Sequence, residues 1–369
     1  MSKVASSADL RSVHVVVPGD IDDGAVLSGG NVYDRRICRG LPAAGWSVHE
    51  FAVTGAWPRP DRDGRASLAR TLAALPDGAI VLIDGLVACG VPDVVIPEAR
   101  RLEVVVLVHL PLGDEVGQAP ASAAELAALE RRTLQSASAV VATSPWSAHR
   151  LVAHHGLGAD RVHVVTPGVD PAPLAPGTDG VTHLLCVGAV TATKGQDLLV
   201  EALATVADLP WSCTLVGSLR RDPAHVAAVR RRIEHHGLGG RLRLAGPRTG
   251  SQLAAAYAAA DLLVLPSRTE SYGMVVTEAL ARGIPVLAAA VGGVPETLGQ
   301  DPDGRVPGIV TPPDDITAVA VALRRWFGEP VLREELRHAA RARRDKLNGW
   351  EATCRCLTGV LDRLRGTPD

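Results

Sequence analysis

The fold can be read from one segment of the chain, Ser267-Arg268-Thr269-Glu270-Ser271-Tyr272-Gly273-Met274-Val275-Val276-Thr277-Glu278. It follows the short apolar run Leu262–Leu265 and leads into a stretch of helical period. Two glutamates stand eight positions apart, with a glycine between them. This order predicts a strand, a loop that carries Glu270, a helix that starts near Gly273, and Glu278 within that helix.

The same alternation of short apolar runs and helical segments extends along the chain. Such runs, rich in Val, Ile and Leu and without polar alternation, are typical of buried parallel strands. The sequence therefore predicts an α/β protein with parallel sheets flanked by helices. The expected strands form two series: Val13–Val17, Val48–Val53, Ile80–Asp84, Val104–His109, Ala139–Thr143 and Val162–Thr166, then His183–Val187, Ser212–Val216, Leu242–Ala245, Leu262–Leu265, Val286–Ala289 and Gly308–Val310. The expected helices include Asn31–Ala44, Ala121–Ser136, Gln196–Ala207, Asp222–His236, Ser251–Ala259 and Met274–Arg282.

The two series of strands are separated by Pro167–Gly177, a segment rich in proline and glycine with no apolar period. We therefore predict two doubly wound α/β domains of similar size. The first covers residues 1–170 and the second covers residues 171–349. Residues 350–369 contain a final amphipathic helix, Trp350–Arg365.

The composition is that of an ordinary globular protein, with 47% apolar and 21% charged residues. A net charge of -2 gives no electrostatic reason to expect nucleic acid as a partner. The six cysteines are scattered and lack zinc-site spacing, which favours reduced thiols, a cytoplasmic location and no metal site. No apolar run approaches the roughly 18 residues of a membrane span, so any membrane contact is expected to be peripheral.

Glu270 and Glu278 have a simple alternative explanation. Glu278 and Arg282 are four residues apart, and a solvated pair of this kind is worth only about 0.3 kcal/mol. The order strand, Glu270, Gly273, helix and Glu278 favours a ligand site instead, because ligands of open α/β sheets lie beyond the carboxyl ends of the strands. Carboxylates suit sugar hydroxyls, and the free amides after Gly273 suit phosphate. A nucleotide-sugar has both groups.

Lysine is rare in this chain, since Lys3, Lys194 and Lys346 are its only lysines among 38 basic residues. Lys194 lies near the end of the loop Gly188–Gly195, just before a predicted helix. A helix N-terminus disfavours a cation, so this position indicates a bound anion such as a diphosphate. The loop matches neither a Walker loop nor the G-x-G-x-x-G pattern. The alternative is a solvated surface lysine.

Two further positions lie at a strand end or a helix start. His109 ends the run Val104–His109, although a lone histidine there is as often structural as functional. Gly29 and Gly30 precede a helix that we expect Asn31 to cap, which would form another helix start suited to an anion.

Together these motifs resemble the family 4 retaining glycosyltransferases, which have the GT-B fold. The similarity covers most of the chain and is more specific in the C-terminal half, as expected where acceptors vary. The resemblance implies two Rossmann-like doubly wound domains that face each other across a cleft, with the last helix crossing back to the first domain. The matching segments are Gly29-Gly30, Val106–Pro111, Val165–Asp170, Leu185–Gly195, Ala260–Ser267, the Glu-x7-Glu pair of Glu270 and Glu278, Gly283–Val286 and Gly292–Glu296.

The resemblance also implies an activity. A sugar would pass from a UDP- or GDP-sugar to a small-molecule or lipid-linked acceptor, with retention of anomeric configuration and without a metal or cofactor. Glu270 would bind the donor sugar, Glu278 the ribose and Lys194 the diphosphate. The implied catalytic residues are His109, Lys194 and Glu270, and the implied donor-binding residues are Gly29, Gly30, Lys194, Glu270, Gly273, Met274, Val275 and Glu278.

One position departs from the family pattern. Many relatives carry an arginine where this chain has Ala189, and that arginine helps the lysine to hold the diphosphate. Either Lys194 acts without this partner or another arginine replaces it. Because both lie near strand ends, Arg268 and Arg248 are the candidates, and we include Arg268 among the expected donor-binding residues.

The sequence therefore predicts a glycosyltransferase. A GT-B nucleotide-sugar epimerase or hydrolase is one alternative, and turnover without an acceptor would favour it. A non-catalytic nucleotide-sugar-binding protein is the other, and tight binding without turnover would favour it.

Overall fold

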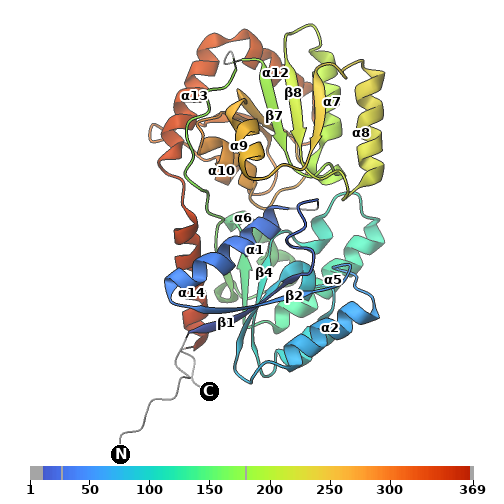
Figure 1. Cartoon of the computed structure of the whole chain (residues 1–369), viewed down its shortest axis with the longest axis vertical. Coiled ribbons are helices and arrows are strands. Elements are labelled where there is room, and N and C mark those ends of the chain that lie inside the picture. Colours follow the sequence, from blue (N-terminus) through green and yellow to red (C-terminus); the bar gives the residue numbers. More distant parts are fainter. Residues whose placement is uncertain (1–10, 26–27, 179–180, 366–369) are drawn as a thin grey trace, which may run out of the picture.

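The computed structural model describes residues 11–25, 28–178 and 181–365, which form two stacked lobes (Figure 1). Each lobe contains a six-stranded parallel sheet, in the orders β2-β1-β3-β4-β5-β6 and β12-β11-β10-β7-β8-β9. All of the predicted strands are confirmed. Their bounds are β1 (Ser12–Pro18), β2 (Ser47–Val53), β3 (Ile80–Asp84), β4 (Glu103–Val108), β5 (Ala139–Ala142), β6 (Val162–Val164), β7 (His183–Val187), β8 (Ser212–Val216), β9 (Leu242–Gly246), β10 (Leu262–Leu265), β11 (Val286–Ala289) and β12 (Gly308–Thr311).

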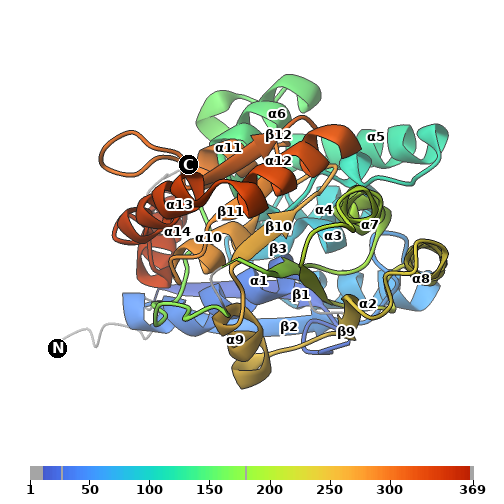
Figure 2. The same cartoon turned by 90° about the horizontal axis from the view of Figure 1, so that it is seen from above.

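Helices connect the strands and cover the sheets. Figure 2 looks down through the upper lobe onto the lower one, and the two sets of strands overlap in that view. The helices are α1 (Gly29–Gly40), α2 (Arg62–Ala73), α3 (Gly85–Ala88), α4 (Pro92–Glu98), α5 (Pro120–Ser136), α6 (Pro145–His155), α7 (Gln196–Thr205), α8 (Pro223–His235), α9 (Gly250–Ala258), α10 (Met274–Leu280), α11 (Val294–Leu298), α12 (Ile316–Gly328), α13 (Pro330–Arg344) and α14 (Trp350–Arg365).

The non-alternating apolar runs arise because both faces of each sheet are buried. Along β4, Val104 and Val106 belong to one hydrophobic cluster, whereas Val105 and Leu107 belong to another on the opposite face. The residues Val104–Val108, which follow Glu103 in β4, are all apolar, which is the pattern expected of a sheet covered by helices on both sides.

The chain crosses between the lobes twice. It first passes from β6 to β7 through the extended segment 165–176, and it returns after α13 to form α14. Leu357 and Leu361 of α14 pack in the same cluster as β1, and Figure 1 shows α14 beside α1. The two crossings are bonded to each other, because Val169 N donates to Asn348 O at 3.0 Å.

The start of α1 differs from the prediction. We expected Asn31 to cap the helix, but the cap is Ser28, whose side chain accepts a hydrogen bond from Asn31 N. The helix therefore begins at Gly29, and both glycines lie in its first turn. A serine cap satisfies an amide of that turn as well as an asparagine would, so the sequence did not discriminate between the two.

The carboxyl ends of the two sheets face each other. Ser271, which follows β10, donates through Oγ to the carbonyl oxygen of His109, which follows β4. Val116 N donates to Thr193 Oγ1 at 3.3 Å, and this bond also joins the two lobes. The junction between the lobes is therefore the edge at which the sequence predicted a ligand site.

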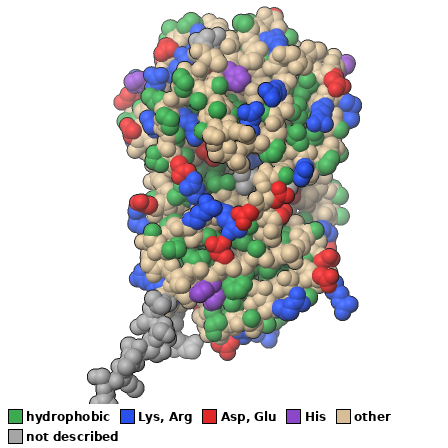
Figure 3. Space-filling view, in the orientation of Figure 1, with side chains coloured by type: hydrophobic (Ala, Val, Ile, Leu, Met, Phe, Trp, Pro, Cys, Tyr) green, Lys and Arg blue, Asp and Glu red, His purple; other side chains and the backbone are tan. Residues whose placement is uncertain are grey.

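On the face shown in Figure 3, acidic and basic side chains are intermingled, and no large area carries charges of a single sign. This distribution agrees with the net charge of -2. Within the described ranges, no helix has the length and apolar character needed to cross a membrane.

Candidate active site

The central contact of the site joins Lys194 to Glu270. Lys194 Nζ lies 2.6 Å from Glu270 Oε1, and Ser267 Oγ donates to the same oxygen at 2.8 Å. Glu270 is only 8% exposed, so its carboxylate is shielded from most water. The two residues follow β7 and β10, which are neighbours in the second sheet. Lys194 is therefore not a solvated surface lysine, and two residues from separate motifs meet at one point.

The glycine pair after β11 holds the loop that carries Glu270. Gly293 N donates to Glu270 O at 3.1 Å. Gly292 has a φ of +53°, and a Cβ at this position would overlap the carbonyl oxygen of Glu270. A side chain here would be strained and would displace the loop. Gly292 and Gly293 thus fix the backbone of Glu270.

Helix α10 begins where the sequence predicted. Gly273 is its N-cap residue, with a φ of +86°, and no side chain caps the helix. The first amides of α10, those of Met274 and Val275, therefore have no side-chain acceptor at this end. The sulfur of Met274 also lies near Gly29, because an added Cβ on Gly29 would be 3.4 Å from it. This proximity brings the two predicted helix starts together.

Glu278 lies on the same helix and is bound by a tyrosine. Tyr257 Oη donates to Glu278 Oε2 at 2.6 Å. Burial raises the pKa of Glu278, although Tyr257 and Arg282 act to lower it. Arg282 donates to the backbone oxygen of Glu278 at 2.7 Å and stacks over the Tyr257 ring. The solvated Glu278–Arg282 side-chain pair that we considered is therefore not what holds this carboxylate.

Each nitrogen of the Arg268 guanidinium group donates a hydrogen bond to another group of the protein. Its guanidinium donates to both oxygens of Asp197 at 3.0 and 2.9 Å and to Asp314 Oδ1 at 2.7 Å. It also donates to the carbonyl oxygen of Ala192 at 2.7 Å. Burial favours the neutral form of Asp197, but hydrogen bonds from Arg268 outweigh this effect and lower the pKa of Asp197. Arg268 thus ties α7 to the loop that carries Lys194.

The other candidate substitute, Arg248, follows β9 at the edge of the second sheet. Because β8 separates β9 from β7, Arg248 does not follow a strand next to the one that leads to Lys194. Arg268 is therefore held by Asp197, Asp314 and Ala192, and the replacement of the missing arginine by Arg268 or Arg248 stays a prediction.

His109 lies against two buried carboxylates of the first lobe. Its Nε2 is 2.8 Å from Asp34 Oδ1 and 4.0 Å from Asp84 Oδ2. Burial alone would lower the pKa of His109, but the two carboxylates outweigh it and raise the pKa to about 9. Burial and the charge of Asp34 raise the pKa of Asp84 to about 8. Gly30 packs on the ring, because an added Cβ would lie 2.9 Å from His109 Cδ2.

The ligand atoms of Asp34, Asp84 and His109 lie within 4.8 Å of one another, a separation that could also surround a cation. The shortest contact, however, joins a ring nitrogen to a carboxylate oxygen at hydrogen-bond distance. We therefore describe the group as a hydrogen-bonded ion pair with a second acid beside it.

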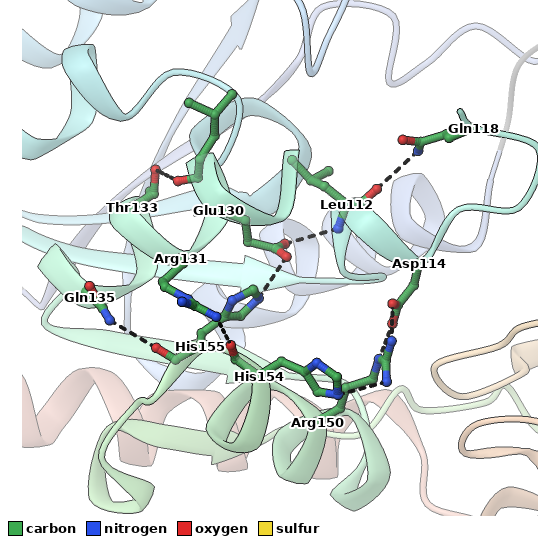
Figure 4. Close-up of polar contacts among 11 residues, drawn as sticks. Leu112, Asp114, Gln118, Glu130, Arg131, Thr133, Gln135, Arg150, His154 and His155 are labelled. Carbon is green, nitrogen blue, oxygen red and sulfur yellow. Dashed lines mark hydrogen bonds and ion pairs between the residues drawn. The ribbon is translucent and has the colours of Figure 1, made fainter. Parts of the chain in front are cut away.

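A buried network fastens the segment that follows His109 (Figure 4). One oxygen of Glu130, on α5, accepts a hydrogen bond from Leu112 N at 3.2 Å. The other oxygen lies 3.0 Å from His155 Nε2, on α6. Glu130 is 1% exposed, so both of its oxygens depend on these partners. The network thereby fixes the backbone just beyond His109.

The outer part of the same segment is held by two further contacts, also seen in Figure 4. Asp114 forms a bidentate pair with Arg150, and Gln118 Nε2 donates to Leu112 O at 3.1 Å. Val116, between them, reaches the loop of Lys194 through Thr193. The segment therefore connects the first lobe to the predicted phosphate loop.

Several residues of this site were not anticipated from the sequence, namely Asp34, Asp84, Asp197 and Tyr257. Asp34 stands four residues after Gly30 on α1, a spacing that places both on one helix face. Asp84 ends a buried strand next to β4. The positions of Asp34 and Asp84 could have been recognised from the sequence, because an acid on the first turns of such a helix or at the end of such a strand lies at the ligand-facing edge of the sheet. The partners Asp197 and Tyr257 come from other helices, and only the packing identifies them.

Comparison with protein-family models matches both halves of the chain. Residues 27–173 match the model described as "Glycosyltransferase Family 4". Residues 178–343 match the model described as "Glycosyl transferases group 1". The two matches follow each other and divide at the segment between the sheets.

Curated relatives of similar sequence carry one name. The D-inositol 3-phosphate glycosyltransferase of Jonesia denitrificans is 30% identical over 269 residues, which are 68% of this chain and 62% of that protein. The D-inositol 3-phosphate glycosyltransferase 1 of Catenulispora acidiphila is 32% identical over 276 residues, which are 69% of this chain and 64% of that protein. The match thus spans less than two thirds of the length of these relatives.

Solved structures share the fold over nearly the whole chain. Sucrose-phosphate synthase from Thermosynechococcus elongatus superposes with a TM-score of 0.79 at 22% identity, covering 96% of this chain and 99% of that one. Anabaena Alr3699/HepE in complex with UDP and glucose gives a TM-score of 0.74 at 19% identity, covering 95% and 99%. The glycosyltransferase WaaG, involved in lipopolysaccharide biosynthesis, gives 0.71 at 18% identity, covering 96% and 100%.

Proposed function

Because the chain belongs to the family 4 glycosyltransferases and has their GT-B fold, we propose that it transfers a sugar from a nucleotide-sugar to an acceptor with retention of anomeric configuration. The observation that carries this proposal is the contact between Lys194 and Glu270 where the carboxyl ends of the two sheets meet. One site there offers a cation for a diphosphate and a shielded carboxylate for sugar hydroxyls.

In this proposal the second lobe holds the donor. Glu270 accepts hydrogen bonds from the sugar, Glu278 accepts from the ribose, and Lys194 binds the diphosphate. The amides of Met274 and Val275, together with the backbone of Gly29 and Gly30, complete the phosphate site. Protein groups then supply the positive charge that stabilises the negatively charged leaving diphosphate, so we propose that no metal or cofactor is needed.

The first lobe is proposed to hold the acceptor. His109 lines the reacting centre from this side, and the segment fixed by Glu130 forms its wall. The curated relatives are named for D-inositol 3-phosphate, and one solved neighbour was crystallised with UDP-glucose. D-Inositol 3-phosphate and UDP-glucose are therefore the first acceptor and donor to test, with GDP-sugars and lipid-linked acceptors as the comparison set.

A cytoplasmic location is also part of the proposal. All six cysteines are unpaired, five of them buried and Cys356 exposed. Unpaired thiols of this kind suit a reducing compartment.

A thermal-shift panel of UDP- and GDP-sugars tests donor binding, because a ligand that binds only the folded state raises the melting temperature. We expect one nucleotide series to stabilise the protein and Lys194→Ala to abolish that shift. A coupled assay of nucleotide release then separates the reactions. Release that depends on an acceptor supports transfer, whereas release without any acceptor indicates a hydrolase or epimerase. A panel in which no nucleotide-sugar raises the melting temperature contradicts the proposal.

A further inference from the structure

We propose that Asp34 and Asp84 share one proton and hold His109 as an imidazolium, so that the first lobe supplies a second cation to the donor site. The donor part of this inference rests on the proposed function. The arrangement of charges within the first lobe does not, and it can be tested by itself.

The geometry places a ring nitrogen between two carboxylates. Asp34 comes from α1 and is 1% exposed, and Asp84 ends β3 and is 7% exposed. His109 Nε2 lies 2.8 Å from the first and 4.0 Å from the second. A carboxylate this deeply buried requires a positive partner, and the imidazole is the group that contacts it.

A proton shared with Asp34 explains why a second buried acid, Asp84, can lie beside it. Asp34 Oδ2 is buried and receives no hydrogen bond from a donor in the part of the chain that the structure describes. The carboxyl group of Asp84 is the neighbouring acid, and its ligand atom lies within 4.8 Å of that of Asp34. A hydrogen bond between the two acids would give Asp34 Oδ2 a partner. Two carboxylates can form such a bond only when one of them carries a proton. One proton between them satisfies the otherwise unpartnered oxygen and leaves a single negative charge to balance His109.

Among the residues that the structure describes, the charged groups that act on His109 are Asp34 and Asp84. The ionisable side chains facing the ring are Asp34 of α1, Asp84 of β3 and the edge-on ring of Tyr33, whose centroid lies 5.3 Å away. Burial raises the pKa of Tyr33 well above its usual value, so this phenol stays neutral. The carboxylates also raise the pKa of His109 to about 9, in agreement with the geometric argument.

The consequence for the site depends on the other ring nitrogen. Because Nε2 is turned toward Asp34, Nδ1 is the nitrogen that remains for a ligand, and in the imidazolium it is a donor. The carbonyl oxygen of His109 is bonded to Ser271, the residue next to Glu270, so the ring stands at the same junction as Lys194. Ala189 brings no cation to that junction, and Arg268 is committed to Asp197 and Asp314. His109 is therefore placed to act as the second cation.

The charge state of His109 can be measured without any substrate. Histidine side chains labelled with 15N are followed by NMR as pH is raised, and the His109 signal is assigned by its loss in His109→Gln. We expect both ring nitrogens of His109 to stay protonated up to about pH 9. Asp34→Asn should lower this titration, and the Asp34→Asn/Asp84→Asn double variant should bring it to or below the ordinary value of 6.5, because burial then acts unopposed. Asp84→Asn alone should leave His109 charged at neutral pH, since the contact with Asp34 remains.

A matched control is available in the second lobe. His236 Nε2 lies 2.9 Å from Glu201 Oε2 on the outer helices, in a pair of the same kind. Glu201→Gln should leave the titration of His109 unchanged. If His109 of the native protein titrates near 6.5, or if the double variant titrates like the native protein, the shared-proton arrangement is wrong. Binding of Zn²⁺ or Mn²⁺ that perturbs the His109 signal at micromolar concentration and is lost in Asp34→Asn would also overturn it.

The donor part is tested with UDP and GDP as probes at pH 7.5, by calorimetry. Loss of one charge-assisted hydrogen bond should weaken the affinity of the double variant for the bound nucleotide about tenfold. Glu201→Gln should bind as the native protein does. Equal affinities of the native protein and the double variant refute the role of His109 as a second cation. Absence of binding by the native protein refutes the proposed function instead, while the NMR titration still decides the proton arrangement.

Discussion

Lys194 Nζ and Glu270 Oε1 are 2.6 Å apart, and each comes from a loop that follows one of two adjacent strands. The cation proposed for the diphosphate is thus neutralised by the carboxylate proposed for the sugar. A bound donor would contact both, and its phosphate would compete with Glu270 for the ammonium group. The two residues proposed to bind the donor therefore also hold each other in place.

The first prediction concerns Lys194→Ala. Removing the lysine leaves Glu270 buried without its counter-charge, so we expect a loss of stability of about 2 kcal/mol together with loss of donor binding. The stability change is measured by thermal or denaturant unfolding and the binding by the thermal-shift panel. Lys346→Ala, at an exposed lysine of the same lobe, is the control and should change neither quantity. A Lys194→Ala protein that binds donor normally would contradict the assignment.

A second prediction separates Arg268 from Lys194. Because Arg268 is bound by Asp197, Asp314 and the Ala192 carbonyl group, Arg268→Ala should lower stability by about 2 kcal/mol and weaken donor binding far less than Lys194→Ala. Unfolding and donor titration of both variants measure the difference. Normal stability with abolished donor binding would instead support direct contact between Arg268 and the diphosphate.

The Arg268–Asp197 pair also predicts a dependence of stability on pH. The folded pKa of Asp197 lies below its unfolded value of 3.8. The pair therefore contributes stability that is fully present above pH 3.8 and is lost as pH falls through the lower folded value. Stability measured between pH 6 and pH 3 should decline more steeply in the native protein than in Asp197→Asn. Parallel curves would show that this carboxylate is not linked to folding.

A fourth prediction concerns Glu278, whose pKa is raised by burial from its usual value of 4.5. A carboxyl group whose pKa is raised on folding contributes stability to the folded protein below pH 4.5, and this contribution is lost as pH rises through the folded pKa. At pH 7 the ionised carboxylate therefore lowers the stability of the folded protein. Glu278→Gln should therefore unfold at an equal or higher temperature while its affinity for the nucleoside falls. Tyr257→Phe should weaken nucleoside binding less, because it removes the partner of the carboxylate but not the carboxylate itself. A nucleoside affinity unchanged in Glu278→Gln would refute the ribose role.

The last prediction uses two helical glycines. In Gly30→Ala the new Cβ would lie 2.9 Å from His109 Cδ2, so the ring must move and turnover should fall at least tenfold. In Gly359→Ala, on α14, nothing lies within 4 Å of the new Cβ. That control should gain about 0.5–1 kcal/mol of stability from its better helix propensity and keep full activity. Rates and unfolding curves of the two variants test whether the packing of Gly30 on His109 matters for the reaction.

The strands were predictable because their two buried faces leave apolar residues at every position, as Val104 to Val108 show. The positions of Lys194, Glu270 and His109 followed for a related reason, since parallel strands place their carboxyl ends at one edge. The bounds of α1 were less secure, because Ser28 and Asn31 are both suitable caps. A helix cap is determined by residues close to the helix start, so such short-range signals carry little information about the tertiary structure.

The partners of the site residues could not be read in the same way. The structure shows that Arg268 is bonded to Asp197, in the first turn of α7, and to Asp314, which lies far along the chain. The sequence shows that an arginine is near a strand end, but it does not show which acid will neutralise it. Asp34 is a different case: its spacing of four residues from Gly30 was readable, but its contact with His109 exists only when α1 and β4 are packed together.

The hydrogen bond between Val169 N and Asn348 O has a mechanical consequence. The two passages of the chain between the lobes lie side by side there and are joined backbone to backbone. A relative rotation of the lobes that bent both passages together would keep this bond, whereas sliding one passage along the other would break it.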